Sequence, residues 1–152
     1  MIESAKSMIP TSLASSLEPV LKKQTENRLG DIHWFRTDWQ RGGAATGFST
    51  WQNGDKSPLD VVVKLPIVEK ELRWTRRLQD EDGVAPCLLA GNDELGGYDL
   101  AWMIIERFPV GPLGKHWENS NIDRIADAAA RFTLSATSFE VDQDGRLEDW
   151  DE

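Results

Sequence analysis

The sequence predicts an α+β fold in which a five-stranded antiparallel sheet carries one packed helix. Five candidate strand segments follow one another between residues 33 and 108. Four of them are rich in aromatic and β-branched residues, which favour strands, and the short segment over residues 87–90 is apolar. Short turns containing Gly or Asn separate most of the segments, which favours antiparallel neighbours. A single amphipathic stretch after the third segment supplies a helix that can cover the sheet.

The first element is a helical pattern over residues 11–23. Its Leu and Val side chains fall roughly on one side, and Pro19 interrupts the pattern. Gly30 then ends the segment. We therefore predict that residues 1–30 form an N-terminal helical extension.

The next two elements are strands over residues 33–39 and 48–52. A Gly-rich turn over residues 41–47 joins them, and Asn53-Gly54, a strong turn signal, ends the second strand.

Residues 59–65 then predict a third strand, which Pro66 ends. Because Pro is favoured at the first position of a helix, we expect a helix over residues 67–79. Two further strands are predicted, a short one over residues 87–90 and a longer one over residues 98–108.

A break over residues 109–112 separates this sheet from the last predicted helix, over residues 121–138. Residues 140–152 form an acidic tail. The order of elements is therefore three strands, a helix, two strands, a break and a helix, which is not the alternation of a dinucleotide-binding βαβ fold.

The composition excludes several classes of protein. Its 17 Lys and Arg residues against 26 Asp and Glu give a formal net charge of −9, so we expect neither nucleic acid nor an anionic membrane as a partner. The single cysteine, Cys87, cannot form an internal disulfide. No apolar run approaches the roughly 20 residues of a membrane helix, and residues 1–21 hold no apolar block of a signal peptide. We therefore expect a cytoplasmic protein.

Lys64 is the first candidate functional residue. It stands in the run Val61-Val62-Val63-Lys64-Leu65, where both faces of the strand are apolar, so its side chain points towards a buried partner or a cleft. An unpaired buried ammonium is costly, and Lys64 therefore needs an anion. The alternative is a lysine whose head reaches solvent from the end of the strand.

Glu71 is the candidate partner of Lys64. At ~100° per residue it falls within the apolar arc of the predicted helix 67–79. Glu69 falls on the opposite face with Arg73, as a solvated pair one turn apart. Lys64 is the nearest cation in the sequence, and the alternative is that Glu71 pairs with an arginine or lies at the edge of the arc.

The order of these parts is that of a kinase ATP-binding lobe: a Gly-rich hairpin, a Lys on the third strand, a Glu on the following helix and two more strands. Over about residues 31 to 115 the sequence resembles the aminoglycoside phosphotransferase and choline kinase-like family, whose ATP-binding lobe would span residues 31–110. The segments that carry the resemblance are Asp60-Val-Val-Val-Lys64-Leu-Pro, Glu71-Leu-Arg-Trp-Thr-Arg-Arg-Leu78, Gly83-Val-Ala-Pro-Cys-Leu-Leu-Ala-Gly91 and Trp102-Met-Ile-Ile-Glu-Arg-Phe-Pro-Val-Gly111.

The resemblance implies a role for each part. Lys64 would bind the phosphates of ATP, and Glu71 would hold Lys64 in place. The backbone of Glu106, Arg107 and Phe108 would be the hinge that holds adenine.

The glycine-rich turn would lie over the phosphates. Residues 42–49 nearly match the P-loop pattern, but Phe48 stands at the lysine position and a strand follows where a P-loop needs a helix. A P-loop is therefore excluded, and what remains is a turn whose backbone N–H groups can approach phosphates. The resemblance gives this role to Gly42, Gly43 and Gly47.

The family's catalytic loop is absent from this sequence. Family members carry His-Gly-Asp followed by Asn, and then a metal-binding Asp, whereas both histidines here precede a tryptophan. We therefore expect an N-terminal lobe alone, with no catalytic or metal-binding residue of its own and no activity by itself. Residues 111–152 would be the hinge exit, a helix and an acidic tail at the start of an absent second lobe, which would hold the Mg²⁺ ligands.

Two partners and one rival function remain open. The last helix would expose an apolar stripe that the missing lobe or a second copy in a homodimer would cover. The rival function is a non-catalytic binding or interaction domain on the same scaffold. The stripe consists of Ile122, Ile125, Ala129 and Phe132.

Overall fold

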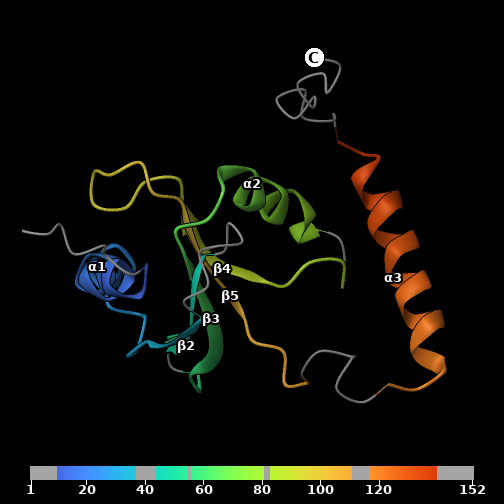
Figure 1. Cartoon of the computed structure of the whole chain (residues 1–152), viewed down its shortest axis with the longest axis horizontal. Helices are drawn as coiled ribbons and strands as arrows, with labels where there is room; N and C mark the ends of the chain where they lie inside the picture. Colours follow the sequence, from blue (N-terminus) through green and yellow to red (C-terminus); the bar gives the residue numbers. More distant parts are fainter. Residues whose placement is uncertain (1–9, 37–43, 55, 81–82, 111–116, 140–152) are drawn as a thin grey trace, which may run out of the picture.

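The structure is a computed structural model, and it describes residues 10–36, 44–54, 56–80, 83–110 and 117–139. It confirms the predicted α+β class with a five-stranded antiparallel sheet (Figure 1). The strands lie in the order β1-β2-β3-β5-β4, so that β5 is inserted between β3 and β4. Their bounds are β1 His33–Arg36, β2 Ala45–Trp51, β3 Leu59–Leu65, β4 Leu88–Asn92 and β5 Trp102–Glu106.

One face of the sheet forms the core. Val61, Val63 and Leu65 of β3 are fully buried on it, because alternate residues of a strand point to the same side. Trp102 and Ile104 of β5 join them in one buried cluster. We call this side the α1 face, because helix α1 covers it.

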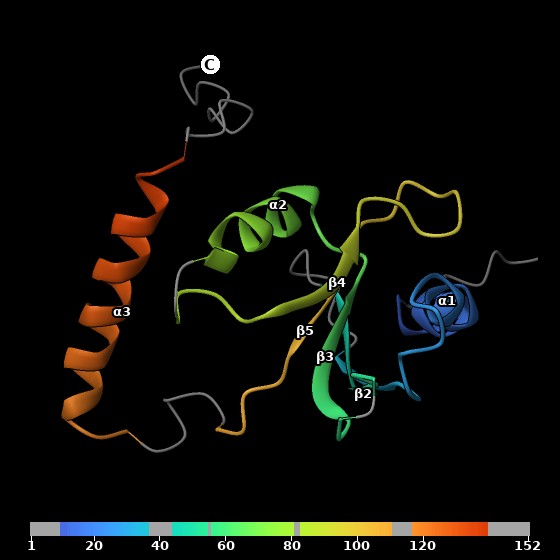
Figure 2. The same cartoon turned by 180° about the vertical axis from the view of Figure 1, so that it is seen from behind.

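Helix α1 (Pro10–Gln24) lies on the α1 face, on the other side of the sheet from α2 (Figures 1 and 2). An ion pair of 2.6 Å joins Lys22 to Asp31, just before β1. This hydrogen bond raises the pKa of Lys22 and lowers the pKa of Asp31. The α1 side chains that pack into the core are Ala14, Leu17, Val20 and Leu21.

The opposite side of the sheet carries Lys64, and we call it the Lys64 face. Its apolar members in the paired strands are Phe48, Val62, Met103 and Ile105. Helix α2 (Glu69–Arg77), which continues into a 3-10 turn (Leu78–Asp80), covers one end of this face.

Helix α2 fits closely against β4 and β5 because Gly91 has no side chain. Leu72 of α2 is fully buried, and a Cβ placed on Gly91 would lie 2.7 Å from the Cδ1 atom of Leu72. The same Cβ would lie 3.5 Å from the Cβ of Met103, which is nearly buried. The glycine therefore sets how near α2 can approach the Lys64 face.

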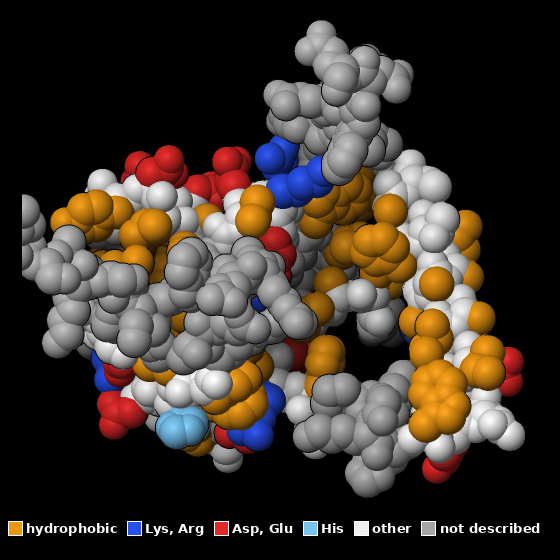
Figure 3. Space-filling view, in the orientation of Figure 1, with side chains coloured by type: hydrophobic (Ala, Val, Ile, Leu, Met, Phe, Trp, Pro, Cys, Tyr) orange, Lys and Arg blue, Asp and Glu red, His pale blue; other side chains and the backbone are white. Residues whose placement is uncertain are grey.

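Helix α3 (Ser120–Ala136) lies beside α2, on the side away from α1 (Figures 1 and 2). Phe139, just after it, meets Trp74 of α2 edge to face at 6.2 Å. Along α3, apolar side chains reach the surface (Figure 3), including Ile122, Ile125 and Phe132, as predicted. Among the helices in the described ranges, none is both long and apolar enough to cross a membrane.

Strands β2, β4 and β5 differ from the predicted bounds, and β4 spans Leu88–Asn92 rather than residues 87–90. Strand β2 starts at Ala45 rather than Phe48, so the end of the predicted Gly-rich turn belongs to the sheet. Strand β5 is shorter than residues 98–108, because Tyr98 pairs with Leu95 across the turn that follows β4. The predicted residues 37–39 of the first strand lie outside the described residues.

Candidate functional site

Lys64 stands near the end of β3, in the middle of the sheet. Its strand neighbours are Thr46 of β2 and Met103 of β5. Only 25% of its side chain is exposed, although Lys64 belongs to the face that α1 does not cover. The strand therefore holds a partly buried ammonium group on the open side of the sheet.

Glu71 supplies the anion for this ammonium group. It lies in the first turn of α2, and the short connection from β3 is fixed where the Ile67 N–H donates to the Ala101 carbonyl at 2.9 Å. The Lys64 Nζ donates to Glu71 Oε1 in an ion pair. Of the alternatives that the sequence left open for Glu71, the structure shows the pairing with Lys64.

The neighbouring charges on α2 are arranged as expected for solvent contact. Glu69 pairs with Arg73 one turn later, at 3.8 Å, and its side chain is more exposed than that of Glu71. Glu71 keeps 40% of its side chain exposed, so the Lys64–Glu71 pair is reachable from solvent. An ammonium group has three hydrogens, and the contact with Glu71 uses one of them.

Of the three glycines predicted to cover phosphates, Gly47 is the one that lies within the described residues. Gly42 and Gly43 are outside the part of the chain that the structure describes. Gly47 lies within β2, opposite Val63 and on the α1 face. A Cβ there would meet Ile32 at 2.5 Å and Trp34 at 3.1 Å, so the absence of a side chain lets these residues pack against β2.

The predicted hinge follows directly from β5, and two of its backbone donors are already used. The N–H of Glu106 donates to Cys87, and that of Arg107 donates to Asp60, at 2.9 and 3.0 Å. The Glu106 side chain in turn accepts from the Cys87 N–H at 2.8 Å. Of the three predicted hinge residues, Phe108 is the one whose N–H has no partner within the described residues.

A hollow of about 420 Å³ lies beside the hinge, lined by Glu106, Phe108, Gln79 and residues 83–87. Its size is within the range of small-molecule pockets. Gln79 stiffens the wall, because its side chain binds the Pro86 carbonyl and the Leu88 N–H. Lys64 and Glu71 do not line this hollow, so it lies beside the ion pair rather than around it.

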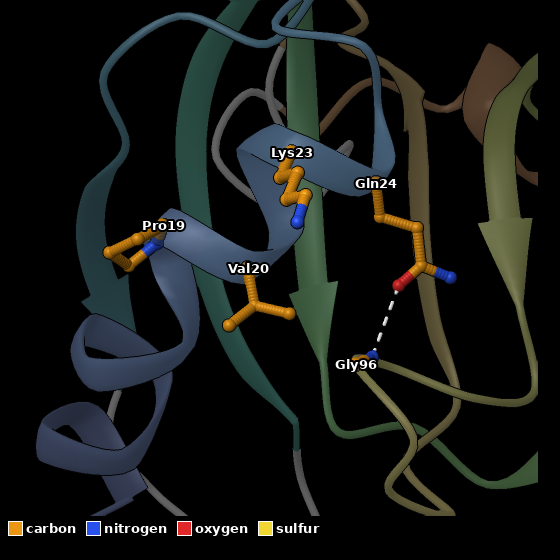
Figure 4. A pocket seen from close by; sticks show the side chains of 5 residues that line it. All are labelled: Pro19, Val20, Lys23, Gln24 and Gly96. Atoms are coloured by element: carbon orange, nitrogen blue, oxygen red, sulfur yellow. Dashed lines mark hydrogen bonds between the residues drawn. The ribbon is translucent and has the colours of Figure 1, made fainter.

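A second hollow, of about 640 Å³, lies between α1 and the turn before β5 (Figure 4). Gln24 spans it: its amide donates to the Glu94 carbonyl and accepts from the Gly96 N–H. Pro19 and Lys23, which also line it, are exposed. Both ends of the Gln24 amide are used in hydrogen bonds to the backbone after β4. We therefore interpret Gln24 and this hollow as the place where α1 is attached to the sheet, and not as a ligand site.

The sequence reasoning missed an aromatic and cationic stack on the Lys64 face. Phe48 is stacked on Phe35, with ring centroids 4.2 Å apart. The guanidinium carbon of Arg107 lies 3.8 Å from the Phe48 ring centroid. Phe48 stands at the lysine position of the near P-loop, but no sequence pattern points to Arg107 as its neighbour.

No metal centre was expected in this chain. Within the described ranges, no group of three or more His, Cys, Asp or Glu side chains is placed to hold a metal ion. Comparison of the chain with protein-family models, with curated proteins and with solved structures found no match.

Proposed function

We propose that this chain is the nucleotide-binding lobe of a small-molecule kinase of the aminoglycoside phosphotransferase type. The observation that carries the proposal is the Lys64–Glu71 ion pair between the third strand and the helix that follows it. In kinases, a lysine on this strand and a glutamate on this helix must be paired for the phosphates of ATP to be held.

Lys64 would hold the phosphates of ATP, and the remaining hydrogens of its ammonium group are suited to phosphate oxygens. Glu71 would fix the position of Lys64, since its own place is set by the anchored start of α2. ATP supplies the phosphoryl group that such an enzyme transfers to a hydroxyl. A cytoplasmic location belongs to the same proposal, because the proposed function requires ATP.

The base of the nucleotide would be held at the hinge. The Phe108 N–H is the backbone donor available there, because Glu106 and Arg107 already donate within the sheet. Val62 and Ile105 offer apolar surface on the same face as Lys64. The phosphates would thus meet the Lys64 ammonium group, and the base would meet an apolar surface and a backbone donor, on one side of the sheet.

Catalysis needs groups beyond this lobe. The sequence has no His-Gly-Asp segment, and the described residues offer no metal site. The proposed role of this chain is therefore binding and orientation of ATP, with the catalytic base and the Mg²⁺ ligands supplied by another lobe. By itself the chain is expected to transfer no phosphoryl group.

Calorimetric titration with ATP tests the proposal. Wild-type protein is expected to bind ATP weakly, and Lys64→Ala is expected to weaken binding about ten- to a hundredfold, the range for hydrogen bonds to charged groups. Glu71→Ala should weaken binding by less, and should have no further effect in the Lys64→Ala background.

Lys70→Ala is the matched control, because Lys70 is an exposed lysine of α2, the helix that carries Glu71. It removes the same charge without touching the ion pair, and ATP affinity should be unchanged. Equal losses in Lys64→Ala and Lys70→Ala would refute the proposal, as would the absence of ATP binding by the wild type at millimolar concentration.

A second candidate function is a non-catalytic interaction domain on the same scaffold. The exposed apolar stripe of α3 favours it, since large apolar side chains gathered on a surface mark interaction sites. Ile122 is 60% exposed and Phe132 47%. The ATP titration separates the two functions, because only the first requires Lys64.

A further inference from the structure

Arg107 crosses the sheet to reach Phe48. Strand β3 lies between β2, which carries Phe48, and β5, which Arg107 follows. Neighbouring strands are about 4.8 Å apart, so the two backbones are separated by about 10 Å. The guanidinium carbon nevertheless lies 3.8 Å from the centroid of the Phe48 ring. The side chains of Arg107 and Phe48 must therefore meet above β3.

The strand register places this contact at the level of Asp60 and Val62. Phe48 is the β2 neighbour of Val62, and the Arg107 N–H is bonded to Asp60, two residues before Val62 on the same strand. Val62 and Lys64 point to the same side of β3, two residues apart. The guanidinium group on Phe48 therefore lies next to Val62, the apolar surface on which the base of a Lys64-bound nucleotide would lie.

We propose that Arg107 is a displaceable plug of the nucleobase site. This inference rests on the proposed nucleotide-binding function. The guanidinium group holds the surface over Val62 while no nucleotide is bound, and a nucleobase must move it off Phe48 to reach that surface. Arg107 is exposed, and a cation–π contact at an exposed site is worth only about 0.5–1 kcal/mol, so a bound base can break it.

Because only a nucleobase has to displace the guanidinium group, the plug lowers the affinity for ATP relative to that for a ligand without a base. Arg107→Ala is expected to raise the ratio of ATP affinity to tripolyphosphate affinity about two- to fivefold, which is the cation–π energy expressed as a ratio of binding constants. Tripolyphosphate is the reference because both ligands lose attraction when a positive charge is removed. Phe48→Leu, which removes the ring and keeps the arginine, should raise the ratio similarly.

Arg28→Ala is the matched control. Its guanidinium lies 4.8 Å from the ring of Trp51, a residue of β2 on the α1 face. The substitution removes an exposed arginine and a cation–π contact away from the proposed site, so the affinity ratio should stay that of the wild type.

A spectroscopic measurement tests the displacement itself. The Nε–H resonance of Arg107, assigned by its loss in Arg107→Lys, should move on saturation with ATP and should not move with tripolyphosphate. The proposal is refuted if the ratio of ATP affinity to tripolyphosphate affinity falls or stays constant in Arg107→Ala. It is also refuted if saturation with ATP does not change the chemical shift of the Arg107 Nε–H. Both results leave the Lys64-dependent binding of ATP intact, whereas loss of all binding in every variant refutes the two proposals together.

Discussion

At the scale of single residues, Phe108 allows the proposed hinge to be tested apart from the ion pair. Phe108→Pro removes its backbone N–H, and ATP affinity is expected to fall about two- to tenfold, as for the loss of one neutral hydrogen bond. Tripolyphosphate affinity should not change, because that ligand meets Lys64 alone. Calorimetry with both ligands measures the two effects.

Phe108→Ala provides the comparison for this substitution. It removes the exposed phenyl ring and keeps the N–H group. If the two variants lose the same amount of ATP affinity, the side chain rather than the backbone donor is responsible, and base recognition by the hinge N–H is refuted.

Single residues also show how far the sequence predicts the site. The need of Lys64 and Glu71 for partners could be predicted, because a lysine in an apolar strand and a carboxylate in an apolar helical arc are both costly to leave unpaired. That they pair with each other was one of the alternatives that the sequence left open. The contact between Arg107 and Phe48 could not be predicted. It depends on β5 lying next to β3, and residue patterns within separate strands carry no information about their order in a sheet.

At the scale of elements, the fit of α2 on the sheet depends on Gly91. Gly91→Ala would bring a methyl group to 2.7 Å from Leu72 Cδ1 and to 3.0 Å from the Trp102 carbonyl. We expect the substitution to lower the free energy of unfolding by about 1–3 kcal/mol, as in other overpacked cores. Urea denaturation followed by circular dichroism measures the change.

The pair Leu72→Ala and Gly91→Ala tests this explanation. Leu72→Ala alone should cost about 2–5 kcal/mol by leaving a cavity. If the contact between the two side chains is the cause, the double variant should lose less stability than the two single variants added together. Additive losses would contradict it and point to the backbone contact with Trp102.

Elements also differ in how well their bounds could be predicted. The third strand was predicted correctly as residues 59–65, because its β-branched run ends at Pro66. The start of the second strand was placed three residues too late, since Ala44 to Gly47 have the composition of a turn. In the structure Gly47 serves the packing of Ile32 and Trp34 instead, and this contact between strands is not visible in the local sequence.

At the scale of the whole molecule, α3 is expected to make the chain self-associate. Its exposed apolar stripe would be buried by a second copy in a solution of this chain, since burial of apolar surface favours association. Sedimentation equilibrium should show an average mass that rises with concentration. Phe132→Asp should reduce this association, because a charged group would have to be buried in the interface.

Leu134→Asp is the control for the added charge, because Leu134 is exposed on the same helix and, at ~100° per residue, lies on the side opposite the stripe. It should associate like the wild type. A wild-type chain that stays monomeric at every concentration tested would contradict the prediction.

The insertion of β5 between β3 and β4 has a consequence for how the chain acquires its structure during synthesis. Strand β4 emerges from the ribosome before β5, and β5 is its sheet neighbour. Trp102 and Ile104, which complete the cluster under α1, arrive with β5 as well. Until residue 106 has emerged, the nascent chain therefore carries α1 and four strands, of which β4 has no sheet neighbour, around an incomplete core. Such exposed apolar surface favours aggregation, so chaperone demand should peak just before β5 is released.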